Sequence, residues 1–80
     1  MKLPVIKQLV TDHSLEELIE AEEAFLEEKS PKIKVEGEDE GEQLTHVMAA
    51  AWVKHEMEKE DIPLNKAVRN YTVKVRNSIS

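Results

Sequence analysis

The sequence predicts an all-α fold, a small bundle of about four helices. Two observations support this prediction. The 80 residues contain only 2 glycines and 3 prolines, and 35% of them are charged. Apolar residues also recur at helical spacing in four separate stretches. A chain of this length is expected to form a single helical domain, residues 1–80.

The first two helices are indicated by their starts and by their apolar stripes. One is expected over residues 4 to about 12, because Pro4 is tolerated in a first helical turn. The next is expected over residues 14 to about 28, where Ser14 and Glu17 form a capping box. Pro31 then stops this helix, because the residue before a proline avoids the helical conformation. The stripes consist of Ile6, Leu9 and Val10 in the first helix, and of Leu15, Leu18, Ile19, Phe25 and Leu26 in the second.

The next stretch alternates charged and apolar residues over positions 32–36, a pattern typical of a strand. Five residues are few, so the prediction is a short strand or an extended segment. Residues 36–42 then form an acidic loop with five carboxylates in seven positions. Its acids lie before the third helix, where the helix dipole favours negative charge.

The third helix, expected from residue 40 or 42 to 59, is apolar almost all round. One face carries Leu44, Val47, Met48, Ala51 and Trp52, and a roughly opposite face carries Ala49, Ala50, Val53 and Met57. A helix without a polar side is buried on several sides. It is therefore expected to be the central helix of the bundle or part of a subunit contact.

The second of these faces is a candidate interface. One apolar stripe from each helix suffices for the core of one chain, so Ala49, Ala50, Val53 and Met57 are expected to contact a second copy across a two-fold axis. The alternative is that the first helix covers this face within the chain through its own apolar stripe. The core itself is expected to contain Leu18, Phe25, Leu44, Met48, Trp52 and Tyr71.

The fourth helix is expected from residue 64 or 65 to 78, and its apolar stripe extends to Ile79. Its charges, Lys66, Arg69, Lys74 and Arg76, are all basic. They could make the protein a nucleic-acid accessory factor, but the net charge of −6 opposes that partner. Attraction to the acidic segments, within the chain or across a dimer, is the preferred interpretation.

Several classes of site are not supported. The chain has no cysteine, no serine in a nucleophile elbow and no glycine-rich phosphate loop, so no catalytic residue and no cofactor are predicted. No apolar run approaches the ~18 residues of a membrane span, and the start lacks a signal-peptide pattern. A cytoplasmic location is therefore expected.

A metal or small-ligand site is the alternative to a pure interaction protein. Glu42 and His46 are four residues apart on one helix face, a spacing that can hold zinc, and the acidic loop could add oxygen ligands. The loop does not match the EF-hand pattern. A histidine in a polar contact, or one that is partly buried, is the preferred interpretation of His46, so no metal is predicted.

The chain resembles a short family of uncharacterised bacterial proteins, a domain of unknown function. The resemblance rests on the opening Met1–Ile6, the Ser14–Leu18 cap, the Glu36–His46 stretch and the closing Val75–Ile79. It implies a free-standing bacterial protein and assigns no functional residue. The function predicted from the residues is non-enzymatic: self-association as a homodimer, with a further protein partner possible.

Overall fold

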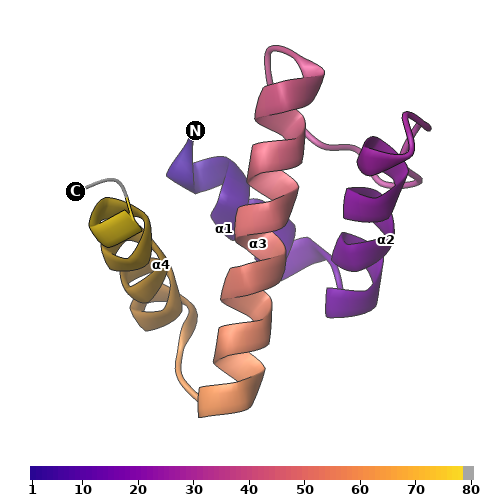
Figure 1. The fold of residues 1–80 in the computed structure, drawn as a ribbon. Helices are drawn as coiled ribbons and strands as arrows, with labels where there is room; N and C mark the ends of the chain where they lie inside the picture. Colours follow the sequence, from indigo (N-terminus) through magenta and orange to yellow (C-terminus); the bar gives the residue numbers. More distant parts are fainter. Residues whose placement is uncertain (79–80) are drawn as a thin grey trace.

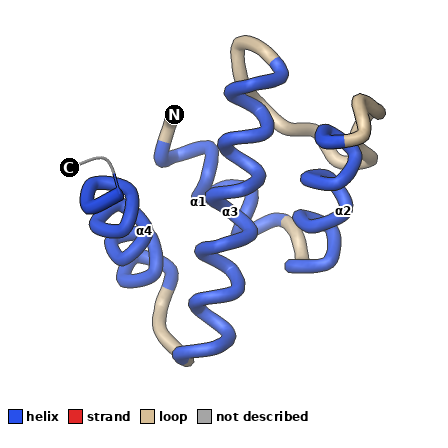
Figure 2. Tube along the Cα trace, viewed as in Figure 1, coloured by secondary structure: helices blue, strands red, loops and turns tan. Residues whose placement is uncertain are grey.

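Four helices make up the part of the chain that the structure describes, as the sequence predicts. A computed structural model describes residues 1–78, and within them it contains helices and loops but no strand (Figures 1 and 2). The helices are α1 (Leu3–Asp12), α2 (Leu15–Leu26), α3 (Glu40–Glu60) and α4 (Leu64–Ser78). Ile79, which the spacing assigns to the apolar stripe of the last helix, lies outside the described residues.

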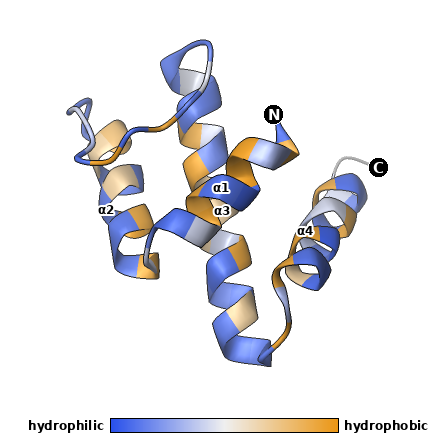
Figure 3. Ribbon diagram, turned by 180° about the vertical axis from the view of Figure 1, so that it is seen from behind, coloured by the Kyte–Doolittle hydropathy of each residue, from blue (hydrophilic) through white to orange (hydrophobic). Residues whose placement is uncertain are grey.

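Helix α3 is the central element. It packs against α1, α2 and α4, whereas the other pairs of helices make few contacts or none. Helices α4, α3 and α2 lie side by side in one layer, with α3 in the middle (Figure 1). Helix α1 crosses one side of this layer, and the view from behind shows it in front of α3 (Figure 3). The opposite side of the layer carries no further helix among the described residues.

The ends of α2 show how local sequence sets the boundaries. The Ser14 hydroxyl accepts a hydrogen bond from the Glu17 N–H at 3.2 Å, and the Glu17 carboxylate accepts one from the Ser14 N–H at 2.9 Å, so the capping box is present. The helix ends at Leu26, two residues before the predicted end. Glu28 has a left-handed φ of 60°, and the Lys29 N–H donates to the Ala24 carbonyl. This is a Schellman ending, which glycine usually supplies and which the sequence therefore did not reveal.

Residues 32–36 form no strand. No backbone partner lies beside them, so the alternating pattern produces an irregular connection between α2 and α3. The pattern still decides which side chains are covered. Val35 is buried and Ile33 is half-buried against the core, while Lys32, Lys34 and Glu36 are exposed.

The core differs in part from the predicted set. Leu18 is fully buried, but Phe25, Leu44, Trp52 and Tyr71 are only partly covered, and Met48 is 47% exposed. The prediction was wrong for Met48 because α3 is apolar all round, so its sequence could not show which stripe faces inward. The largest fully buried side chains are Ile6, Val10, Leu18, His46, Val47 and Val53.

Candidate interaction surfaces

The predicted interface lies inside the chain. Ala49, Ala50 and Val53 are each 0% exposed, and Met57 is half-buried against the core. The prediction assumed that the core of a single chain does not need these residues, and this assumption is therefore wrong. They cannot meet a second copy as predicted while the chain keeps this fold.

The covering element on this side of α3 is α1. The Lys54 ammonium donates to the Val10 carbonyl at 3.0 Å, and the His46 ring accepts from the Lys2 N–H at 3.0 Å. These two bonds place the two ends of α1 along one side of α3. Ala50, between them, has a side chain small enough for α1 to approach closely. The alternative in which the first helix covers this face within the chain is the one that the structure favours.

The opposite side of α3 is the open one. At about 100° per residue, Met48, Trp52 and His55 lie across the helix from the side that contacts α1. A shallow hollow of about 280 Å³ lies there, between α3 and α2. Its apolar lining consists of Leu15, Ile19, Met48, Ala51 and Trp52, with Glu22 and His55 also contributing. We call this surface the open face.

Two residues of the open face are large, apolar and exposed. Ile19 on α2 is 42% exposed and Met48 on α3 is 47% exposed. Sequence reasoning missed both as surface residues, because each lies on an apolar stripe that was assigned to the core. Contiguous apolar surface of this kind marks interaction sites more often than scattered single residues do.

An aromatic pair joins the open face to α4. The Trp52 and Tyr71 rings are tilted by 53°, with their centroids 5.6 Å apart, within the range of favourable aromatic contacts. Partial burial raises the pKa of the Tyr71 hydroxyl above its usual value of 10.0. This ring contact with Tyr71 holds the Trp52 side chain in place at the edge of the hollow.

His46 is a structural residue. It is 0% exposed, and both ring nitrogens are engaged. Nδ1 lies 2.7 Å from the Glu36 carbonyl oxygen, and Nε2 lies 3.0 Å from the Lys2 nitrogen. Because a carbonyl only accepts and an N–H only donates, the ring is neutral and carries its proton on Nδ1. His46 therefore has no lone pair left for a metal.

Glu42 is also engaged, in a cluster at the start of α3. Its Oε1 accepts from the Glu38 N–H at 2.8 Å, and its Oε2 lies 3.6 Å from the terminal amine of Met1. The Glu38 hydrogen bond, with smaller help from the positive charge of that amine, lowers the pKa of the Glu42 carboxyl below 4.5. The pair Glu42 and His46 thus holds the N-terminus and the acidic loop against α3. Among residues 1–78, no group of three metal-binding side chains is present.

The basic charges of α4 find no acidic partner within the described chain. Lys66, Arg69, Lys74 and Arg76 are exposed, and none of the ion pairs among residues 1–78 includes them. The acidic helix α2 lies on the other side of α3 (Figure 1). The expected attraction between these segments is therefore absent within one chain.

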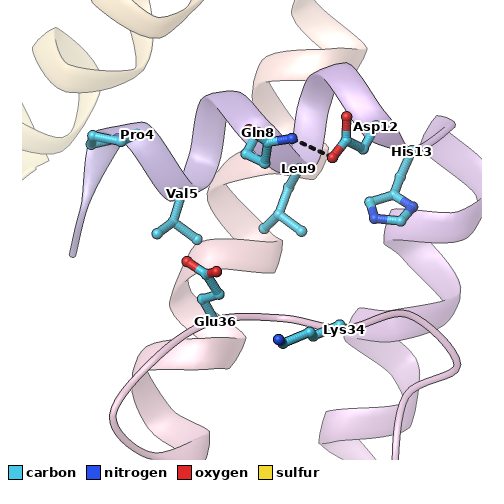
Figure 4. A pocket seen from close by; sticks show the side chains of 8 residues that line it. All are labelled: Pro4, Val5, Gln8, Leu9, Asp12, His13, Lys34 and Glu36. Carbon is cyan, nitrogen blue, oxygen red and sulfur yellow. Dashed lines mark hydrogen bonds between the residues drawn. The ribbon is translucent and has the colours of Figure 1, made fainter.

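A groove of about 510 Å³ lies between α1 and residues 34–36 (Figure 4). Val5 and Leu9 line it from α1, and Lys34 and Glu36 line it from the connecting segment. Both of these charged side chains are exposed.

Comparison with known protein families gives a match over the whole chain. A family model described as a family of unknown function matches residues 1–80. No curated protein and no solved structure matches the chain. Within the described residues, none of the helices is long and apolar enough to cross a membrane.

Proposed function

The chain belongs to DUF6952, a family of unknown function, and for this member we propose a non-enzymatic role: it associates with a second copy of itself through the open face. The observation that carries the proposal is the uncovered side of the helix layer, with Ile19 and Met48 exposed beside Trp52. Helix α1 covers one side of α3, and a second copy would cover the other.

The size of the layer suits such a contact. The Cα trace extends over 31 × 28 × 19 Å, and the layer of three helices forms its broad side (Figure 1). That side is of the same order as the ~800 Å² that each partner buries in a standard interface. The apolar hollow would lie within it, between α2 and the central α3, with charged residues around it, as in many interfaces.

Charge favours a second copy as the partner. A two-fold axis running along α3 would place α2 of one copy over α4 of the other. The exposed glutamates of α2 would then face the basic residues of α4, which have no ion pair within the described chain. Such rim contacts contribute more to orientation than to affinity.

The cytoplasm is the proposed location, because a chain without cysteine fits a reducing compartment. No nucleic-acid partner is proposed, because the net charge is −6 and the basic residues are few.

The substitution Met48→Glu tests the open face. Across a two-fold axis it would bring two carboxylates together and desolvate both, so we expect the dissociation constant to rise at least ~10-fold, about 1.4 kcal/mol. Sedimentation velocity on parent and variant over a concentration series measures this change. Leu3→Glu is the matched control, because Leu3 is 38% exposed at the start of α1, on the other side of α3, and does not line the hollow.

Two results would contradict the proposal. One is a parent that sediments as a 9.2 kDa monomer at concentrations up to ~1 mM, the weak end of specific association. The other is a dimer that Met48→Glu and Leu3→Glu leave equally intact. Circular dichroism on both variants shows whether each still folds.

A further inference from the structure

The groove between α1 and residues 34–36 has two unlike walls (Figure 4). Val5 and Leu9 point into it from α1 and form an apolar wall. The opposite wall carries Lys34 and Glu36, one positive and one negative side chain. The volume of the groove, about 510 Å³, lies within the range of about 300–1,000 Å³ that is typical of small-molecule sites.

His46 holds both walls in place. Its Nε2 accepts from the Lys2 N–H, just before α1, and its Nδ1 donates to the Glu36 carbonyl of the opposite wall. The Gly37 carbonyl is also fixed to α3, because it accepts from the Gln43 amide at 3.3 Å. Contacts within the chain thus position the two walls, and a ligand does not have to order them.

Two polar side chains on the α1 side of the groove are already paired. The Gln8 amide donates to the Asp12 carboxylate (Figure 4). The His13 ring lies 3.7 Å from the Glu17 carboxylate. A ligand therefore meets its free charged groups on the opposite wall.

Lys34 and Glu36 are these free charges. Within residues 1–78, no ion pair includes either of them, and neither side chain makes a hydrogen bond. They do not pair with each other, although only the buried Val35 separates them in sequence. Because the two charges balance, this wall complements a ligand that is neutral overall and carries one charge of each sign.

We propose that the groove binds the zwitterion of an α-amino acid with an apolar side chain. The ligand carboxylate accepts from the Lys34 ammonium, and the ligand ammonium donates to the Glu36 carboxylate. Both charged groups of the ligand are attached to one carbon, so they can lie between two side chains of one short segment. The apolar side chain of the ligand packs against Val5 and Leu9 and is removed from water.

Other classes of small ligand fit the groove less well. A purely apolar ligand leaves both charges of the wall without a partner. A ligand with a single charge, of either sign, meets one like charge. The groove shares no residue with the open face, so this proposal does not depend on self-association.

NMR titration of the isotope-labelled chain with leucine and with phenylalanine tests the site. Backbone amide signals show where a ligand binds, and we expect saturable shifts at Val5, Leu9, Lys34 and Glu36. Since a ligand of this size makes few contacts, we expect a dissociation constant on the order of 1 mM or lower.

Three analogues of leucine each lack one of the recognised features. Leucinamide has no carboxylate, N-acetyl-leucine has no ammonium, and glycine has no apolar side chain. We expect each analogue to bind at least ~10-fold more weakly than leucine.

Two variants assign each charge of the ligand to its partner. Lys34→Gln removes the contact with the carboxylate, so this chain should no longer prefer leucine over leucinamide. Glu36→Gln removes the contact with the ammonium, so this chain should no longer prefer leucine over N-acetyl-leucine. Lys32→Gln and Glu38→Gln are matched controls that should keep both preferences, because both residues are exposed on the same segment and do not line the groove.

Three results would overturn the proposal. One is the absence of saturable shifts at the groove with leucine and phenylalanine up to ~10 mM, well above the expected dissociation constant. The others are analogues that bind as tightly as leucine, and Lys34→Gln and Glu36→Gln chains that keep the parental preferences. Because both side chains are exposed, we expect circular dichroism to show that these variants stay folded, so a changed preference reports on the ligand contact.

Discussion

His46 connects three parts of the chain that are far apart in sequence. Its ring joins α3 to the Glu36 carbonyl of the connecting segment and to the Lys2 N–H before α1. Both bonds end on backbone groups, so no side-chain partner in the sequence could have revealed them. A polar contact or a partly buried position was predicted for this histidine. The structure confirms the polar contact and shows the ring to be fully buried, and only the fold reveals its two partners.

Replacing His46 by phenylalanine should cost about 2 kcal/mol or more, because two part-buried backbone groups lose their partners and each costs about 1–3 kcal/mol. His46→Asn and His46→Gln separate the two bonds. Asparagine can still donate to the Glu36 carbonyl, and glutamine can still accept from the Lys2 N–H. Urea unfolding measures all three, and we expect the two amides to fall between parent and His46→Phe. Equal stability of His46→Phe and parent would show that the bonds contribute nothing.

At the scale of the element, the capping box of α2 was predicted completely from four residues. Ser14 and Glu17 are close in sequence, so their hydrogen bonds depend on local geometry alone. The end of α2 was not predicted, because the left-handed residue is Glu28 and not glycine. The alternating pattern of residues 32–36 was recognised in the sequence. Whether such a segment pairs with another strand depends on the tertiary structure, which the alternation alone does not determine.

The capping box also gives α2 a pH dependence. The hydrogen bond from the Ser14 N–H lowers the pKa of the Glu17 carboxyl below 4.5. The ionised form therefore stabilises the folded chain above the unfolded pKa of about 4.3, and this contribution is lost as the pH falls through the lower folded pKa. Glu17→Gln keeps a neutral acceptor, so parent and variant should differ in urea stability at pH 7 and converge near pH 3.

The neighbouring Glu16 supplies the control for this experiment. It is exposed in the same first turn and makes no side-chain hydrogen bond. Glu16→Gln should leave the pH profile close to the parental one. If the parent and Glu17→Gln still differ in urea stability at pH 3, ionisation of Glu17 is not the cause of that difference.

At the scale of the whole molecule, the sequence predicted four helices with the third at the centre, and the structure confirms both. It could not predict the rotation of α3 about its own axis. Met48 and Val53 are equally apolar, yet one is 47% exposed and the other 0%. The choice between them depends on where α1 packs, which no single helix encodes.

Val53→Glu should therefore unfold the chain and not produce a folded monomer. The carboxylate would enter a site that is 0% exposed, and an uncompensated buried charge costs about 3–5 kcal/mol or more. The stability of a small domain lies near the lower end of ~5–15 kcal/mol. Circular dichroism and thermal melting measure the loss, with Val73→Glu as the exposed counterpart. A helical, cooperatively melting Val53→Glu chain would show that this side of α3 is not covered by α1.

The central position of α3 also sets the order of events while the protein is being made. Synthesis delivers α1 and α2 first, yet their main packing partner is α3, which ends at residue 60. A helix as short as the 10-residue α1 is marginal in water without a tertiary partner. The emerging chain thus carries two unsupported apolar stripes until α3 has been translated. Helix α4 follows α3 in the sequence and then joins a core that already exists.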